Sequence, residues 1–204
     1  MVSDTSADLA SLFDTVFLSL GSNLGNRKMN MFSALAELTA LLNCEEIEIS
    51  PIFETQAWGN PNQPDYLNCV AKLTFSNLQQ KSLVNTEHRH AYLERFLKDI
   101  KHIEDICGRV PSVQKWSART IDIDILLYND ICYQSPQLTI PHKHMLDRKF
   151  VLIPLNVIAS DLTVPGVGIS VKKLLEKCSD QSQVSLYQSN LKSDSKMLSN
   201  RVCE

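Results

Sequence analysis

Two aspartates, Asp122 and Asp124, lie two positions apart in a stretch that alternates apolar and acidic residues. This alternation predicts a β-strand with three isoleucines, Ile121, Ile123 and Ile125, on one face and both carboxylates on the other. The Cα atoms of such a pair are roughly 6.5 Å apart. That spacing suits two hard cations about 3.5–4 Å apart that share oxygens with a polyphosphate. The pair therefore indicates a site for two magnesium ions.

Positive side chains cluster just before this strand, at Arg109, Lys115 and Arg119. They follow Gly108, a residue type that commonly ends helices, so we expect a polar loop over 109–118. The formal net charge of −3 gives the chain no overall attraction for polyanions, and a bound anion must therefore be held by a local basic cluster. Paired acids beside clustered bases indicate metal-assisted phosphoryl transfer. The alternative is an edge strand whose wet acidic face merely deters aggregation.

The composition is that of one soluble globular domain: 204 residues, 44% hydrophobic and 21% charged. Six scattered cysteines lack Cys-x-x-Cys or zinc-ligand spacing, which predicts reduced thiols in a cytoplasmic protein. Neither a signal-peptide pattern nor an apolar run of membrane-spanning length is found, and no membrane partner is expected. We predict an N-terminal extension over 1–14, a single domain over 15–178 and a polar, disordered tail over 179–204.

Hydrophobic periodicity and turn residues predict the elements that position the acidic pair. Strands are expected at 15–20, 45–55, 66–75 and 121–128, and helices after the turn at 21–26, between 77 and 107, at 150–159 and at 171–178. The first six elements follow the order β-α-β-β-α-β. This order predicts a ferredoxin-like α+β sandwich, with a mainly antiparallel sheet and helices packed on it.

Three local features each allow a functional and a structural interpretation. The Gly21-Ser-Asn turn either exposes backbone amides to a ligand or merely joins a strand to a helix, and it lacks the Gly-Lys-Ser/Thr ending of a P-loop. Trp58, in a loop rich in Gly, Pro and Asn, either covers a ligand or packs on the core. Tyr66 and Asn68 share one strand face, where they either contact a ligand or are structural.

Together these motifs resemble those of the 6-hydroxymethyl-7,8-dihydropterin pyrophosphokinase family of the folate pathway. The matching blocks occur in the family's order between about residues 16 and 159: Leu18-Ser-Leu-Gly-Ser-Asn-Leu-Gly25, Gln63-Pro-Asp-Tyr-Leu-Asn68, Gly108-Arg109, Trp116 to Ile125, and Leu138-Thr-Ile-Pro-His142 through Arg148 and Phe150. The resemblance implies an ATP-dependent diphosphokinase. Such an enzyme transfers the β,γ-diphosphate of ATP to the hydroxymethyl group of the dihydropterin and releases AMP.

The resemblance also implies roles for individual residues. Asp122 and Asp124 would bind two Mg²⁺ ions that bridge the ATP phosphates, while Arg109 and Arg119 neutralise charge during catalysis. The other ATP-binding residues would be Glu104, Trp116, Ile125, Thr139, His142 and Arg148. The pterin would stack between Tyr66 and Phe150 and be read at its edge by Asn68 and by the 55–59 segment, with Thr55, Trp58 and Gly59.

The chain departs from the family pattern at a few ATP-side positions. Pro111 and Ser112 stand where many relatives carry another arginine, and Lys143 stands where some members have an aromatic residue.

Two rival functions are an RNA-binding module of ferredoxin-like fold and an ATP-using enzyme for another flat heterocycle. Carboxylates on the strand face that would bind bases argue against RNA, and release of AMP rather than ADP discriminates between the enzymes. We expect a monomer with ATP and the pterin as its partners.

Overall fold

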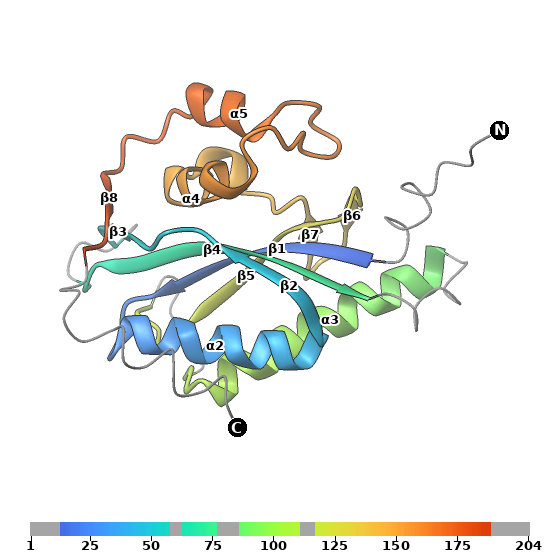
Figure 1. The fold of residues 1–204 in the computed structure, drawn as a ribbon, viewed down its shortest axis with the longest axis horizontal. Helices are drawn as coiled ribbons and strands as arrows, with labels where there is room; N and C mark the ends of the chain where they lie inside the picture. Colours follow the sequence, from blue (N-terminus) through green and yellow to red (C-terminus); the bar gives the residue numbers. More distant parts are fainter. Residues whose placement is uncertain (1–12, 58–62, 77–85, 111–116, 189–204) are drawn as a thin grey trace.

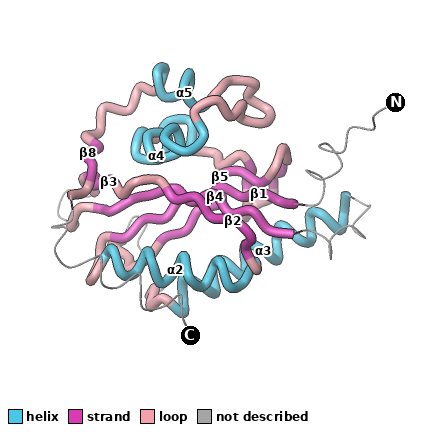
Figure 2. Tube along the Cα trace, viewed as in Figure 1, coloured by secondary structure: helices cyan, strands magenta, loops and turns pink. Residues whose placement is uncertain are grey.

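The computed structural model describes residues 13–57, 63–76, 86–110 and 117–188 of the chain. In this part of the chain a sheet is covered by helices on both faces (Figure 1). Helices α2 (Arg27–Leu42) and α3 (Thr86–Ile106) lie along one face, and α4 (Lys149–Ala159), with α5 (Val171–Lys177) beside it, lies over the other (Figure 2). None of the described helices combines the length and apolar character needed to cross a lipid bilayer.

The main sheet has the strand order β5-β1-β4-β3-β8, with β2 also paired to β4. Its strands are β1 (Phe13–Ser22), β2 (Cys44–Ile49), β3 (Phe53–Thr55), β4 (Tyr66–Ser76), β5 (Asp122–Tyr128) and β8 (Val184–Leu186). Every pair in it is antiparallel. Two short strands, β6 (Tyr133–Gln134) and β7 (Thr139–Ile140), form a separate ribbon. The predicted α+β sandwich is therefore confirmed, with the strand order of the ferredoxin-like fold.

Side-chain alternation along the strands divides the interior into two cores. The core under α2 and α3 includes Leu18, Leu20 and Ile123, all at most 1% exposed. The core under α4 includes Val70 and Leu126 from the opposite face of the sheet. Since successive strand residues point to opposite faces, the acidic positions of β5 belong to the α4 face. The strand thus anchors itself through its isoleucines and presents its carboxylates to the other side.

The predicted strand over 45–55 is divided into β2 and β3. Pro51 lies between them, and because proline has no N–H it cannot continue a sheet ladder. Ser50 instead bonds to Val70 twice: the Ser50 N–H donates to the Val70 carbonyl (2.9 Å), and the Val70 N–H donates to Ser50 Oγ (3.0 Å). This interruption lets β3 pair with the start of β4 while β2 pairs with its end.

Both predicted boundaries of the domain are placed too far inward. Strand β1 begins at Phe13, and Asp14 is 6% exposed, so residues 13 and 14 belong to the sheet rather than to an extension. The prediction of a disordered tail is wrong for 179–188, because β8 pairs with β3 and the Tyr187 N–H donates to the Ile52 carbonyl (2.9 Å). Three residues of paired strand are too few for periodicity to reveal. Residues 1–12 and 189–204 lie outside the described residues.

A buried polar cluster joins β1 to β5 at the end of the sheet away from the acidic pair. The Tyr128 hydroxyl, on a ring that is 2% exposed, donates to Asp14 Oδ2 (2.6 Å), and Asn129 Nδ2 donates to Asp14 Oδ1 (2.7 Å). Hydrogen bonds to a charged group contribute about 1.5–3 kcal/mol. We therefore expect Tyr128→Phe to lower the free energy of unfolding by about that amount in urea titrations.

Tyr133→Phe is the matched control for this substitution. In the wild-type protein the Tyr133 hydroxyl donates to Glu94 Oε1 (2.8 Å), but the ring is only partly buried. Water can therefore replace the lost hydrogen bond, and the free energy of unfolding should fall by less than about 1 kcal/mol. If both variants lowered the free energy of unfolding equally, the buried Asp14–Tyr128 hydrogen bond would contribute no more to stability than the partly exposed one.

Candidate active site

A cleft of about 350 Å³ opens on the α4 face of the sheet. Five parts of the chain line it: strand β1, strands β3 and β4, the end of α3, strand β5 with the residues before it, and the segment that leads into α4. The lining residues are Ser19, Gly21, Thr55, Gln56, Tyr66, Asn68, Lys101, Arg109, Arg119, Asp122, Asp124, His142, His144, Arg148 and Phe150. Residues separated by more than 130 positions thus converge because the strand order places β1 between β4 and β5.

Asp122 and Asp124 both line this cleft. They pair in register with Gly21 and Ser19 of β1, two cleft residues with small side chains. Burial raises the pKa of Asp124, and the negative charge of Asp122 raises it further. Burial also acts to raise the pKa of Asp122, but the guanidinium groups of Arg119 and Arg109 outweigh it and lower that pKa. Asp124 is therefore the member of the pair whose charge is least compensated by the protein.

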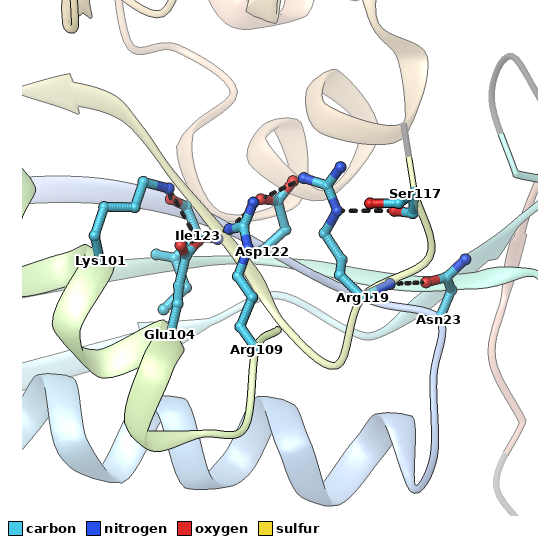
Figure 3. Close-up of polar contacts among 8 residues, drawn as sticks. All are labelled: Asn23, Lys101, Glu104, Arg109, Ser117, Arg119, Asp122 and Ile123. Atoms are coloured by element: carbon cyan, nitrogen blue, oxygen red, sulfur yellow. Dashed lines mark hydrogen bonds and ion pairs between the residues drawn. The ribbon is translucent and has the colours of Figure 1, made fainter. Parts of the chain in front are cut away.

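The two arginines predicted to be catalytic converge on Asp122. Nη1 of Arg109 and Nη1 of Arg119 each lie 2.8 Å from the same carboxylate oxygen, Oδ1 of Asp122 (Figure 3). Their side chains are only 23% and 19% exposed, respectively, so these ion pairs are poorly screened by solvent. Two guanidinium groups are thereby held together in the cleft, beside the carboxylate pair.

Glu104 lies behind the cleft rather than in it. Its side chain is 1% exposed, and its Oε1 accepts the N–H of Ile123 (2.6 Å) and a hydrogen bond from Lys101 Nζ (3.0 Å), as Figure 3 shows. Its Oε2 pairs with Arg109. Strand β5 is at the edge of the main sheet, so its outward N–H would otherwise need another partner. Glu104 therefore fixes β5 and Arg109, and it does not reach the cleft that the resemblance predicted it would share with ATP.

Asn23, which sequence reasoning did not select, connects two sides of the site. Asn23 is 1% exposed, and its Oδ1 accepts a hydrogen bond from the backbone N–H of Arg119 (2.7 Å). The backbone N–H of Asn23 in turn donates to the Arg119 carbonyl (3.1 Å). Nδ2 of Asn23 donates to Gln63 Oε1 (3.3 Å) and to the Pro64 carbonyl (3.2 Å). The turn at 21–26 thus does more than join a strand to a helix, since its asparagine holds two loops. Because asparagine is a common turn residue, its type alone gave no signal.

Tyr66, Asn68, Thr55 and Phe150 line the same cleft as the acidic pair and the arginines. Asn68 is 4% exposed and pairs in register with both Gly21 and Phe53. Its Nδ2 donates to Thr55 Oγ1 (2.9 Å), which fixes the orientation of the amide. The ring and amide predicted to share a strand face therefore do so, and α4 contributes the second aromatic ring.

The predicted ATP residues His142 and Arg148 also line the cleft. The His144 N–H donates to His142 Nδ1 (3.3 Å), so the proton of a neutral His142 ring is on Nε2. Burial lowers the pKa of His142, against the opposing charge of Asp124. In its neutral form, His142 would therefore offer Nε2 as its hydrogen-bond donor.

Other predicted site residues are not placed in the cleft. Ile125 is 2% exposed and packs in the core under α2 and α3, because it lies on the opposite face of β5 from Asp124. Thr139, on β7, is not among the lining residues. Trp58, Gly59 and Trp116 lie outside the described residues. The sequence prediction gave no individual site role to five further lining residues, although two of them lie in the first block that carries the resemblance: Ser19, Gly21, Gln56, Lys101 and His144.

A cleft that gathers carboxylates, guanidinium groups and aromatic rings within an α+β sandwich defines an enzyme acting on small molecules. Residues 17–160 match the sequence model of 7,8-dihydro-6-hydroxymethylpterin-pyrophosphokinase (HPPK). Because this match covers well over half of the chain, the protein belongs to the HPPK family.

Similar full sequences carry the corresponding name. The chain is 35% identical over 172 residues to the 2-amino-4-hydroxy-6-hydroxymethyldihydropteridine pyrophosphokinase of Haemophilus influenzae, covering 84% of this chain and 98% of that protein. It is 36% identical over 151 residues to the pyrophosphokinase of the same name from Aquifex aeolicus, covering 74% of this chain and 84% of that protein.

Among solved structures, the fold is similar to that of Plasmodium falciparum HPPK-DHPS, wild type, with a TM-score of 0.52 and 14% identity. The similarity covers 81% of this chain and 44% of the Plasmodium chain. At this identity the likeness supports the fold alone.

Proposed function

We propose that this protein transfers the diphosphate of ATP to the hydroxymethyl oxygen of 6-hydroxymethyl-7,8-dihydropterin. The products are AMP and the dihydropterin-methyl diphosphate, a step of folate biosynthesis. Membership of the HPPK family supports this activity. The observation that carries the placement of the reaction is the single cleft lined by the acidic pair, by both arginines and by Tyr66, Asn68 and Phe150.

Asp122 and Asp124 fit magnesium, and we propose two ions beside them. Within the described ranges no group of three or more His, Cys, Asp or Glu side chains is arranged to hold a metal ion. A larger cluster is not needed for Mg²⁺, which is usually coordinated by one or two carboxylates together with substrate phosphates and water. Burial and the charge of Asp122 raise the pKa of Asp124, so a bound cation would stabilise its ionised form. When bound, the ions would neutralise the phosphates and orient them for attack.

Arg109 and Arg119 would stabilise the charge that grows during transfer. Attack must occur at the β-phosphorus, because AMP leaves with the oxygen that bridges the α- and β-phosphates. Phosphoryl-type transfer depends on in-line positioning and on neutralisation of charge rather than on covalent help from the protein. Both guanidinium groups lie 2.8 Å from Asp122 Oδ1, and are therefore already gathered beside the carboxylate that would face the phosphates. His142 would donate from Nε2, and Arg148 would add a positive charge, to the same nucleotide.

The pterin would occupy the part of the cleft lined by Tyr66 and Phe150. Rings on both faces, Tyr66 and Phe150, would bury its flat surface, and the Asn68 amide would offer a donor and an acceptor to its edge. The bond from Asn68 Nδ2 to Thr55 Oγ1 uses one amide hydrogen and holds the amide in one orientation. Selectivity for the pterin should come from the hydrogen bonds at its edge, because stacking alone accepts many flat heterocycles.

Gly21→Ala should weaken pterin binding by displacing Asn68. A Cβ at position 21 would lie 3.1 Å from Asn68 Oδ1, closer than an ordinary contact allows. We expect the KM for the pterin to rise about tenfold, equivalent to about 1.4 kcal/mol, with a smaller change in kcat. The double variant with Asn68→Ala serves as the control. If the alanine acts through Asn68, the two effects are not additive, whereas full additivity would contradict this explanation.

The proposed function is tested by identifying the nucleotide product. The purified protein, Mg²⁺, ATP and 6-hydroxymethyl-7,8-dihydropterin should yield AMP and the pterin diphosphate in equal amounts, separated by chromatography. Release of ADP would indicate transfer of a single phosphoryl group and contradict the proposal. Activity only with another heterocycle would contradict the substrate, and tight binding of single-stranded RNA without turnover would favour a binding module. We further propose that the protein is cytoplasmic and monomeric. Its molecular mass in solution tests whether it is a monomer.

A further inference from the structure

The segment after residue 178, which lies beyond the family match, contacts the helix that forms one wall of the cleft. Asp180 accepts two backbone hydrogen bonds: the Lys149 N–H donates to Oδ2 (2.8 Å) and the Ser182 N–H donates to Oδ1 (2.8 Å). Lys149 is the first residue of α4. A carboxylate 31 positions further along the chain thus bonds to the beginning of this helix.

The beginning of α4 needs such a partner. The first N–H groups of a helix have no acceptor within it, and they are usually satisfied by the side chain of the N-cap residue. Here the N-cap is Arg148, whose side chain makes no capping hydrogen bond, and the first turn contains no acidic residue. Asp180 supplies both the missing acceptor and a negative charge, which is favourable at the positive end of a helix. Burial acts to raise the pKa of Asp180, but the hydrogen bonds from Lys149 and Ser182 outweigh it and lower the pKa, so the carboxyl group is ionised at neutral pH.

The residues on either side of Lys149 both line the cleft. They are Arg148, proposed for ATP, and Phe150, proposed for the pterin. The guanidinium carbon of Arg148 lies 5.7 Å from the centroid of the Phe150 ring, so the two side chains also contact one another. A change in the backbone at Lys149 would therefore move one side chain proposed for each substrate.

The segment that carries Asp180 is itself tied to the opposite wall. Beyond it, β8 pairs with β3, with Val184 opposite Thr55 and Leu186 opposite Phe53. Thr55 lines the cleft and accepts the hydrogen bond from Asn68. Figure 1 shows the same path, with the chain running from α5 to β8 at the edge of the sheet. The position of Asp180 is thus fixed relative to the sheet, and not only relative to α4.

We propose that Asp180 is a positioning residue for the transfer reaction, which holds Arg148 and Phe150 in place by bonding to the start of α4. The role as stated rests on the proposed function. It assigns no contact between Asp180 and either substrate, because Asp180 is not among the residues that line the cleft.

The kinetic test compares Asp180→Ala, Asp180→Asn and a control. Loss of a helix cap changes an equilibrium by roughly 3–30-fold, so Asp180→Ala should raise the KM for both substrates within this range while kcat changes by less than about threefold. Asp180→Asn keeps an acceptor oxygen and should restore most of the loss. Glu176→Ala, on the exposed side of α5 near Asp180, should behave as wild type. A loss of stability alone would lower the active fraction, and hence the apparent kcat, without raising either KM.

A second measurement does not depend on activity. The amide exchange rate of Lys149, followed by NMR, should rise at least about tenfold in Asp180→Ala and stay unchanged in Glu176→Ala, because only the former removes its acceptor. If the wild-type protein formed no AMP, the proposed function would be contradicted. The exchange rate would still test whether Asp180 accepts the hydrogen bond from the Lys149 N–H. Unchanged KM values in Asp180→Ala would overturn the positioning role. An unchanged Lys149 exchange rate would overturn its structural basis.

Discussion

Asp124→Asn is expected to abolish diphosphate transfer, with a fall in turnover of at least about 10³-fold, or about 4 kcal/mol of lost transition-state stabilisation. The substitution keeps the shape of the side chain but removes the negative charge that would hold a magnesium ion. Asp124 is the carboxylate of the pair that lacks a direct ion pair with Arg109 or Arg119 in the structure, and its raised pKa reflects that deficit. AMP formation at saturating ATP, pterin and Mg²⁺ is the measurement.

The same substitution should not harm the fold. A carboxyl group with a raised pKa is ionised less readily in the folded protein than in the unfolded chain, so its ionised form opposes folding at neutral pH. A neutral asparagine removes that opposition, and the melting temperature should stay equal or rise. Asp130→Asn, in the exposed turn after β5, is the matched control and should leave turnover unchanged. Near-normal AMP formation by Asp124→Asn would contradict the metal assignment.

Arg119→Ala is expected to lower kcat by about 10²–10³-fold while changing the dissociation constant of the pterin by less than about threefold. The side chain lies 2.8 Å from Asp122, a carboxylate proposed to hold magnesium. Its backbone is held by Asn23 through two hydrogen bonds that do not involve the side chain. Truncation should therefore remove a charge from the transition state without dislodging the loop. Single-turnover kinetics and calorimetric binding separate the two quantities.

Two further variants make this result specific. Arg119→Lys keeps the charge but not the planar fork, and should recover only part of the rate. Arg95→Ala, whose side chain is 82% exposed and lies 3.9 Å from Asp99, is the control for loss of a surface arginine and should act as wild type. Equal losses in turnover and in pterin affinity on Arg119→Ala would indicate simple ground-state binding and contradict the catalytic role.

The core of the site was predictable because it depends on short-range periodicity. Alternation along a strand has a period of two, so the placement of Asp122 and Asp124 on the face opposite Ile123 followed from the sequence directly. The same rule placed Tyr66 and Asn68 together. It also indicated that Ile125 points away from that face, into the core where the structure places it. The implied contact of Ile125 with ATP took no account of this alternation.

Other parts of the site depend on contacts that no local pattern records. Glu104 reaches the N–H of Ile123 across 19 positions, and Asn23 reaches Arg119 across 96. Asp180 lies in a polar segment whose composition predicted disorder, yet it bonds to the start of α4. Each of these residues satisfies backbone groups of a distant element, and residue type and spacing do not reveal which groups will need a partner.

The most direct test of the paired-carboxylate site is a crystal structure with Mn²⁺, 6-hydroxymethyl-7,8-dihydropterin and α,β-methylene-ATP. The carbon bridge of this analogue replaces the oxygen that would leave with AMP, so the complex cannot turn over. We predict two anomalous peaks, each within about 2.5 Å of a carboxylate oxygen of Asp122 or Asp124 and of a phosphate oxygen. A nucleotide whose metal ions contact neither aspartate, with Asp122 still paired to both arginines, would contradict the proposed chemistry.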